Sequence, residues 1–167
     1  MDKTKRYGLR TWIEIDEKEI AHNLKIFRSL VKPDCRIMAV VKSNAYGHGL
    51  VGFSQAAEKL GVDYFGVDSA IEGITLRKNG IKKPILVLGY TLPEMVEKAV
   101  QNNLSLSVAS FDALEAITKL NINKPVKIHL KVDTGMHRQG FMLKDANALI
   151  KIFKNNKIER LISIIFF

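Results

Sequence analysis

Short apolar runs alternate along the chain with stretches of helical periodicity, and this alternation constrains the fold more than any other feature. The runs with strand character cover residues 36–41, 64–67, 85–88, 104–108, 127–132 and 161–165. Strands and helices that alternate with short connections are typical of a parallel sheet covered by helices. The sequence therefore predicts an α/β protein with about six βα units.

Capping residues and glycines mark the helix boundaries. A Ser, Thr or Asp followed by Glu three positions later is a capping-box-like start, and this pattern occurs at Asp16, Ser69 and Thr91. Gly61 and Gly80 stand where helix ends need a left-handed residue. The apolar residues that share one face of the first helix are Ile20, Leu24, Phe27 and Val31. A further strand is predicted at residues 11–15, which divides the chain into an N-terminal strand segment, 1–16, and a barrel-like part, 17–167.

A parallel sheet of this kind either closes into an eight-stranded barrel or stays open and doubly wound. No G-x-G-x-x-G follows the first core strand, where residues 44–49 are instead Asn-Ala-Tyr-Gly-His-Gly, and this disfavours a dinucleotide-binding sheet. A full barrel typically needs about 250 residues, whereas the chain has 167. An arc of about six strands would leave both of its edges unpaired. We therefore expect a partial TIM (β/α)8 barrel.

Charge and composition exclude several classes of partner. Lys and Arg outnumber Asp and Glu by 26 to 17, a net charge of +9, but the basic residues are scattered and form no arm or aromatic stacking platform. We therefore predict no nucleic-acid partner. The chain has neither a membrane-length apolar stretch nor a signal peptide, and its single cysteine, Cys35, fits a reducing compartment. The expectation is a cytoplasmic protein with no membrane partner and no metal site.

Lys42 is the first candidate for chemistry. It shares a strand face with Met38 and Val40, and both faces of this strand are apolar up to Lys42. Its ammonium would lie at the C-terminal end of a buried parallel strand, where ligands bind in such folds. Burial lowers the pKa of a lysine, and a neutral amine can attack a carbonyl to form a Schiff base. The alternative is a lysine that extends into solvent from a strand end.

A second group of polar residues lies in and after the run 127–132. His129, Lys131 and Asp133 share one face of this strand, while Ile128 and Leu130 point the other way. If the apolar face meets the helices, the polar face lines the barrel interior. Arg138 follows beyond the strand, where a guanidinium can hold a carboxylate or phosphate. An edge strand with a wet face and a surface arginine are the alternatives.

Two segments resemble signatures of one known family. Residues 40–49, Val-Val-Lys-Ser-Asn-Ala-Tyr-Gly-His-Gly, closely resemble the pyridoxal-phosphate (PLP) attachment signature of alanine racemases. Residues 130–141, Leu-Lys-Val-Asp-Thr-Gly-Met-His-Arg-Gln-Gly-Phe, resemble a later strand and loop of the same family. Weaker similarity at 11–16, 66–69 and 86–89 extends the resemblance over nearly the whole chain.

The resemblance implies a barrel of the PLP-binding type that interconverts L-alanine and D-alanine, an isomerase activity that supplies peptidoglycan synthesis. Lys42 would hold PLP as a Schiff base and act as one of two bases at Cα. Tyr46 would bind the cofactor phosphate, and Arg138 the substrate carboxylate. Lys131 would be the carbamylated lysine that orients Arg138. The full-length family is homodimeric, and a tyrosine of the partner subunit supplies the second base.

The chain also departs from the family pattern. A histidine-bearing segment ends the sixth barrel strand in the family, but residues 161–167 here are Leu-Ile-Ser-Ile-Ile-Phe-Phe. Later strands and the C-terminal domain have no counterpart, so we expect a fragment that is inactive alone. A non-catalytic PLP-binding barrel is the main alternative function. A PLP decarboxylase or a racemase of another amino acid is a third.

Overall fold

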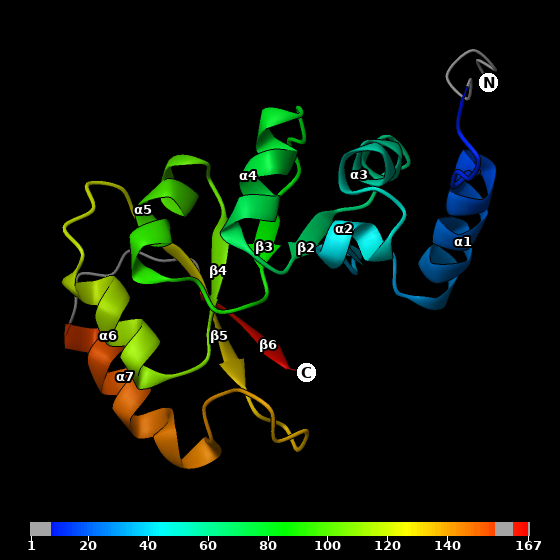
Figure 1. The fold of residues 1–167 in the computed structure, drawn as a ribbon. Coiled ribbons are helices and arrows are strands. Elements are labelled where there is room, and N and C mark those ends of the chain that lie inside the picture. The colour runs from blue at the N-terminus through cyan, green and yellow to red at the C-terminus, as the bar shows by residue number, and fades with distance from the viewer. Residues whose placement is uncertain (1–7, 156–161, 167) are drawn as a thin grey trace.

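The computed structural model describes residues 8–155 and 162–166 and contains one parallel sheet of six strands in sequential order. The strands are β1 (Met38–Val40), β2 (Tyr64–Val67), β3 (Ile85–Val87), β4 (Ser105–Val108), β5 (Lys127–Val132) and β6 (Ile162–Phe166). Each strand pairs in parallel with the next one along the chain. This order is that of a barrel arc, so the predicted partial barrel is confirmed (Figure 1).

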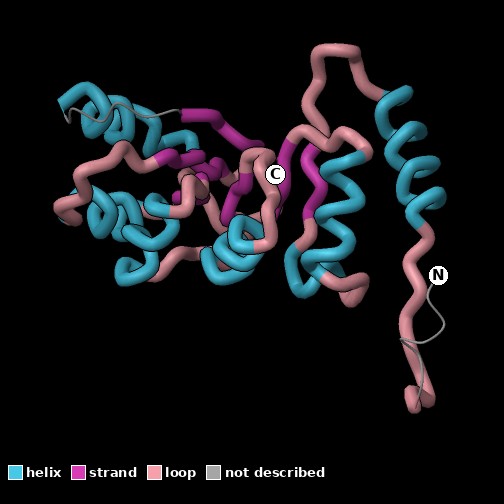
Figure 2. Tube along the Cα trace, turned by 90° about the horizontal axis from the view of Figure 1, so that it is seen from above, coloured by secondary structure: helices cyan, strands magenta, loops and turns pink. Residues whose placement is uncertain are grey.

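Helices connect the strands and cover the outer face of the arc (Figure 2). They are α1 (Glu17–Leu30), α2 (Lys42–Tyr46, a single turn with left-handed backbone), α3 (Leu50–Lys59), α4 (Ala70–Lys78), α5 (Pro93–Gln101), α6 (Phe111–Lys119), the 3₁₀ turn η2 (Leu143–Asp145) and α7 (Ala146–Asn155). Asp16 and Ser69 cap α1 and α4 as predicted. Gly61 and Gly80 have φ of 92° and 89° and follow two of the helices, also as predicted.

The hydrophobic core lies between the sheet and the outer helices. One face of each inner strand is buried there, through Phe65, Val67, Ile85, Val87, Leu106, Val108, Ile128 and Leu130. The helices contribute Leu76, Val96 and Leu114, which are almost fully buried. Each large apolar side chain buried in this way stabilises the fold by roughly 1.5–3 kcal/mol. Because Ile128 and Leu130 meet the helices, the polar face of β5 points to the barrel interior, as the sequence predicted.

The inner face of the arc is curved enough to bring distant strands together. The rings of Tyr64 on β2 and His129 on β5 lie 6.3 Å apart between centroids, although two strands separate them. Gly66 has no side chain, and Leu88 and Met38 fill the space beside it: a Cβ at Gly66 would lie 3.0 Å from Leu88 and 3.1 Å from the Met38 sulfur. Interior side chains therefore converge as they do in a closed barrel.

Two expectations about local structure are wrong. Residues 11–15 form no strand, and Trp12 and Ile13 are 50% and 72% exposed. Thr91 does not cap α5, which begins at Pro93 after Leu92; proline is favoured at that first position because its missing N–H is not needed there. The apolar face of α1 is only partly covered: Leu24 packs against the core, whereas Phe27 is 61% exposed.

The exposure of α1 has a simple geometric cause. Within the described ranges, the outer edge of β1 has no partner strand, so the adjoining face of α1 is covered only in part. Ile20, Leu24 and Phe27 instead line an open hollow of about 560 Å³ beside β1 and α3. The predicted buried strand around Lys42 is therefore an edge strand, and its Val40 is 39% exposed.

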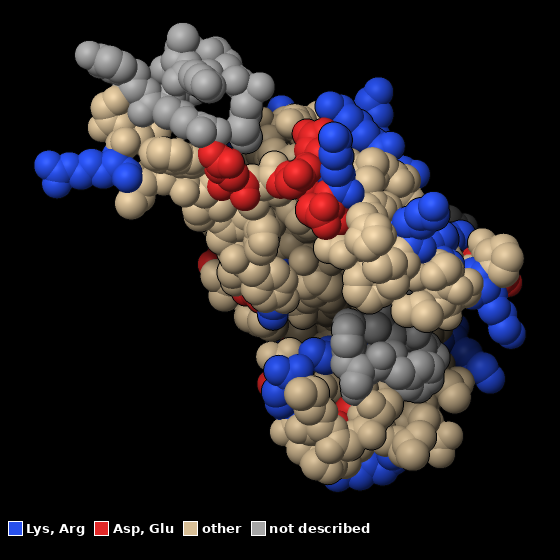
Figure 3. Space-filling view, turned by 90° about the vertical axis from the view of Figure 1, so that its right-hand side faces the viewer, with Lys and Arg blue, Asp and Glu red and all other residues tan. Residues whose placement is uncertain are grey.

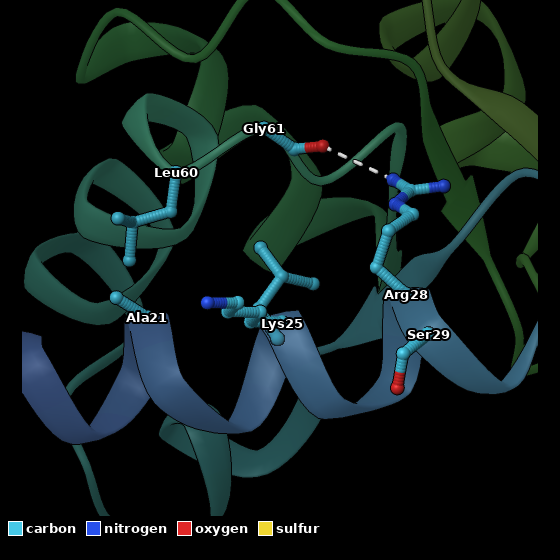
Figure 4. Close-up of a pocket in the computed structure, with 7 residues that line it drawn as sticks. Ala21, Lys25, Arg28, Ser29, Leu60 and Gly61 are labelled. Carbon is cyan, nitrogen blue, oxygen red and sulfur yellow. Dashed lines mark hydrogen bonds between the residues drawn. The ribbon is translucent and has the colours of Figure 1, made fainter. Parts of the chain in front are cut away.

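Arg28 attaches α1 to the end of the sheet where strands begin. Its guanidinium donates to the Cys35 carbonyl at 2.8 Å and pairs with the Asp63 carboxylate at 2.7 Å. A second hollow of about 410 Å³ adjoins it (Figure 4), where Arg28 also reaches the Gly61 carbonyl at 3.3 Å. No predicted site residue lines this hollow, because those residues lie at the opposite ends of the strands.

A second arginine, Arg77 of α4, organises the loops that precede β3 and β4. Its guanidinium donates four hydrogen bonds of 2.7–3.2 Å to backbone carbonyls. The acceptors are the carbonyls of Ile81, Lys83, Asn102 and Asn103. Burial lowers the pKa of Arg77, but these four acceptors compensate for the lost hydration.

The surface shows no concentration of positive charge on the face drawn in Figure 3. Lys and Arg side chains are spread around that face, with Asp and Glu between them. In the part of the chain that the structure describes, no helix is long and apolar enough to cross a membrane.

Candidate active site at the C-terminal ends of the strands

Lys42 lies two residues after the end of β1. The intervening residue, Val41, donates its backbone N–H to the Gly66 carbonyl of β2 at 2.8 Å. The Nζ of Lys42 lies 4.0 Å from Oδ1 of Asp68, which follows β2. The Lys42 side chain is 39% exposed, so the expected burial is wrong: Lys42 follows an edge strand of an open arc. A loose ion pair at this exposure contributes little to stability, and the amine stays accessible to a reactant.

Gly89 brings the end of β3 against Asp68, beside Lys42. Its backbone N–H donates to the Asp68 carbonyl at 3.0 Å. A Cβ at Gly89 would lie 2.5 Å from that oxygen, closer than any side chain tolerates. The absence of a side chain at Gly89 therefore allows the ends of β2 and β3 to meet beside Lys42.

The segment after Lys42 is a left-handed turn. Ser43, Asn44, Ala45 and Tyr46 have φ of 53°, 57°, 52° and 53°. Each non-glycine residue in this conformation costs roughly 1–2 kcal/mol. Hydrogen bonds within the segment offset part of this cost, including Gly49 N–H to the Asn44 carbonyl at 3.0 Å and Leu50 N–H to the Asn44 side chain at 2.8 Å. Backbone strain of this kind is concentrated at functional sites.

Tyr46 ends the left-handed turn and is 61% exposed. The turn thus fixes both Lys42 and Tyr46 through one short piece of backbone. Gly47, at φ 92°, then directs the chain toward α3. Among the residues that the structure describes, the Tyr46 hydroxyl has no hydrogen-bond partner and is free to bind a ligand.

Lys131 lies on the interior face of β5, two residues beyond His129, and is partly buried. His129 is buried, and desolvation lowers its pKa. The sequence placed both residues on this face correctly.

Arg138 is carried by a loop that Asp133 organises. Oδ1 of Asp133 accepts the backbone N–H groups of Gly135 at 2.9 Å and His137 at 3.0 Å, and Oδ2 lies 3.3 Å from His137 Nδ1. The hydrogen bond from Gly135 is the main reason that the pKa of Asp133 is lowered. Arg138 itself is exposed and, within the described chain, makes no hydrogen bond or ion pair.

The loop is closed at its base by Phe141. The Asp133 N–H donates to the Phe141 carbonyl at 3.0 Å, and the Phe141 N–H donates to the Lys131 carbonyl at 2.8 Å. Val132 and Phe141 thus form a parallel bridge. Gly140, at φ 139°, permits this closure, because a Cβ there would lie 2.4 Å from the Asp133 nitrogen.

The structure joins the predicted residues in two pairs. Lys42 and Tyr46 share the left-handed turn after β1, whereas Lys131 and Arg138 share β5 and its loop. Parallel strands bring both pairs to the same end of the sheet. Sequence reasoning missed the position of Asp68 opposite Lys42 and the role of Asp133 in the loop. Asp68 had a signal, since it lies in the Gly-Val-Asp-Ser segment at 66–69.

Comparison with known proteins shows which family this fold belongs to. The family model "Alanine racemase, N-terminal domain" matches residues 15–166. An alanine racemase of Methanococcus maripaludis is 41% identical over 152 residues, which cover 90% of this chain and 40% of that protein. An amino-acid racemase of Enterococcus faecalis is 37% identical over 144 residues, covering 86% and 20%. The chain therefore spans well under half the length of these curated relatives.

Solved structures agree with the sequence matches. The alanine racemase of Clostridium difficile 630 superposes with a TM-score of 0.84 at 35% identity, covering 93% of this chain and 42% of that one. The alanine racemase of Bacillus anthracis with bound L-Ala-P gives 0.83 at 32% identity, covering 92% and 40%. Since the family model matches nearly all of the sequence, this chain belongs to the alanine racemase N-terminal domain family.

Proposed function

We propose that the chain holds PLP at Lys42 and forms the lysine-bearing part of an active site that interconverts L-alanine and D-alanine. The observation that carries the proposal is the accessible Lys42 amine, which the strained turn holds at the ligand-binding end of a parallel barrel arc. The relatives named as alanine racemases support the choice of reaction. The expected setting is a cytoplasmic homodimer that supplies D-alanine for peptidoglycan.

The residues at this end of the sheet fit PLP in their chemistry. Lys42 offers an amine for the aldehyde, and its ion pair with Asp68 is loose, at 4.0 Å. Tyr46 offers a phenol for the phosphate, and Arg138 a guanidinium for an anionic oxygen. Neither side chain has a hydrogen-bond partner in the described chain. When bound, PLP would supply an electron sink that delocalises the negative charge left at Cα when its proton departs.

We assign roles to the chain's own residues on this basis. Lys42 would move a proton at one face of Cα, and Arg138 would orient the substrate carboxylate. Carbamylation would convert Lys131 from a cation to an anion and let it orient Arg138. Inversion needs a base on the other face, which we place outside the region that this chain shares with its relatives.

Borohydride trapping tests the cofactor assignment. The chain is incubated with PLP and reduced, and the modified lysine is identified by peptide mass spectrometry. We expect label at Lys42, loss of that label in Lys42→Ala, and no loss in Lys98→Ala, which removes an exposed lysine of α5. Label that stays on other lysines and avoids Lys42 would refute the proposal.

The Lys131 assignment has its own measurement. Addition of ¹³C-bicarbonate to the chain is expected to give a carbamate signal by NMR that Lys131→Ala removes. A signal that persists in Lys131→Ala would assign the carbamate to another lysine.

A second function, PLP binding without turnover, rests on the same accessible Lys42 amine and needs no base on the other face of Cα. Exchange of the alanine α-proton in D₂O distinguishes the two functions. With Lys42 as the base of one face, we expect the isolated chain to exchange this proton without inverting alanine, whereas a chain that only binds PLP would not exchange it. Inversion of alanine by the isolated chain would show that it contains both bases.

A further inference from the structure

Glu72 of α4, in the next βα unit, anchors the left-handed turn after Lys42. Oε2 of Glu72 accepts the Asp68 backbone N–H at 2.8 Å, and Oε1 accepts the Asn44 backbone N–H at 3.4 Å. The first bond is short and the second is long. One carboxylate thus connects the segment after β1 to the segment after β2.

Helix capping alone does not account for this geometry. Glu72 is the third residue of α4, and Ser69 caps that helix by accepting the Glu72 N–H at 3.3 Å. In a capping box the glutamate at this position reaches back to the N–H of the capping residue itself. Glu72 instead reaches the residue before Ser69 and a residue of another βα unit.

The two anchored residues flank the Lys42 amine. Asn44 lies two residues after Lys42 in the strained turn, and Asp68 carries the carboxylate 4.0 Å from Nζ. Glu72 is partly buried and joins both. Without it, the turn would lose a contact that opposes its return to ordinary right-handed or extended backbone.

We infer that Glu72 is a positioning residue: it holds the left-handed turn against the end of β2 so that the Lys42 amine is presented to the cofactor aldehyde. This inference rests on the proposed function, because it concerns the reactivity of Lys42. Glu72 acts through backbone N–H groups and touches no reacting atom.

The test compares Glu72→Ala with a matched control, Glu58→Ala. Glu58 of α3 also accepts two backbone N–H groups, those of Lys82 at 2.8 Å and Lys83 at 2.7 Å, but before β3 begins. Both variants lose a carboxylate that anchors a loop. Only Glu72→Ala changes the segment that carries Lys42.

Three measurements are made on the whole chain: the PLP concentration for half-maximal borohydride labelling of Lys42, amide hydrogen exchange, and urea unfolding. Glu72→Ala should raise that concentration by about tenfold and speed exchange at Asn44 and Asp68. Glu58→Ala should speed exchange at Lys82 and Lys83 and leave the labelling of Lys42 unchanged. Glu72→Gln keeps one carbonyl oxygen of equal reach and should restore part of the labelling.

The outcomes separate the two proposals. If the unmodified chain is not labelled at Lys42, the proposed function fails. If it is labelled there and Glu72→Ala is labelled equally well, only the role of Glu72 fails. Equal losses in Glu72→Ala and Glu58→Ala would show a general loss of stability and overturn the positioning role. If Glu72→Ala does not fold, Glu72→Gln decides, and normal labelling with unchanged Asn44 exchange in that variant overturns the inference.

Discussion

Replacing Ser43 with glycine should stabilise the protein, although glycine destabilises most positions. Ser43 has φ 53° and is exposed, and its side chain makes no hydrogen bond in the described chain. Relief of the left-handed conformation is worth roughly 1–2 kcal/mol. The greater freedom of glycine in the unfolded chain costs about 0.4–1 kcal/mol. The difference predicts a net gain of about 0.5–1 kcal/mol in the free energy of unfolding.

Urea unfolding followed by far-UV circular dichroism measures this gain. The control is Ala148→Gly, at an exposed position in the right-handed helix α7, where glycine should cost about 1 kcal/mol. The two substitutions introduce the same residue, so opposite signs report the local backbone conformation. A loss of similar size in both variants would refute the left-handed turn.

Other perturbations act at separate points of the fold. Arg77→Ala should lower the free energy of unfolding by about 3 kcal/mol in urea titrations, since it removes four charge-assisted hydrogen bonds, whereas Arg36→Ala, at an exposed arginine, should change it by less than about 0.5 kcal/mol. Gly89→Ala forces a Cβ against the Asp68 carbonyl and should cost about 1–3 kcal/mol in the same titration. Because a backbone N–H and an arginine lower the pKa of Asp63 below 3.8, its ionised form stabilises the fold. The stability advantage over Asp63→Asn should be complete about one pH unit above the unfolded-state pKa of about 3.9 and be lost as the pH falls through the lowered pKa. Acid titration of the two proteins measures this loss.

Strand positions were predictable because each inner strand is a short apolar run between helices. The predicted ranges 64–67 and 127–132 coincide with β2 and β5, and the face of β5 was also correct. The first strand was overextended, since 36–41 was predicted and β1 is Met38–Val40. The prediction assumed that both faces of this strand are buried. Burial depends on neighbouring strands and helices, and not on the apolar run alone.

The site was only partly predictable from the residues. Lys42, Tyr46, Lys131 and Arg138 were selected by motif, and their roles remain predictions. Four consecutive left-handed residues without glycine contradict local propensity, so no pattern of residue types predicts the turn after Lys42. The contacts of Glu72 join segments 28 residues apart in the sequence, a separation that periodicity does not report.

The base of the loop that carries Arg138 also affects how this protein tolerates change. Because Val132 and Phe141 are already bridged, residues at the tip of the loop, away from Asp133 and Gly140, can be inserted or exchanged without separating the loop ends, and doubling such a loop costs only about 0.6 kcal/mol of closure entropy. Substitution of Met136, which is 61% exposed, would then alter the loop surface near Arg138 and leave β5 in place. With Arg138 holding a ligand as proposed, specificity can diverge at this tip while the barrel frame stays constant.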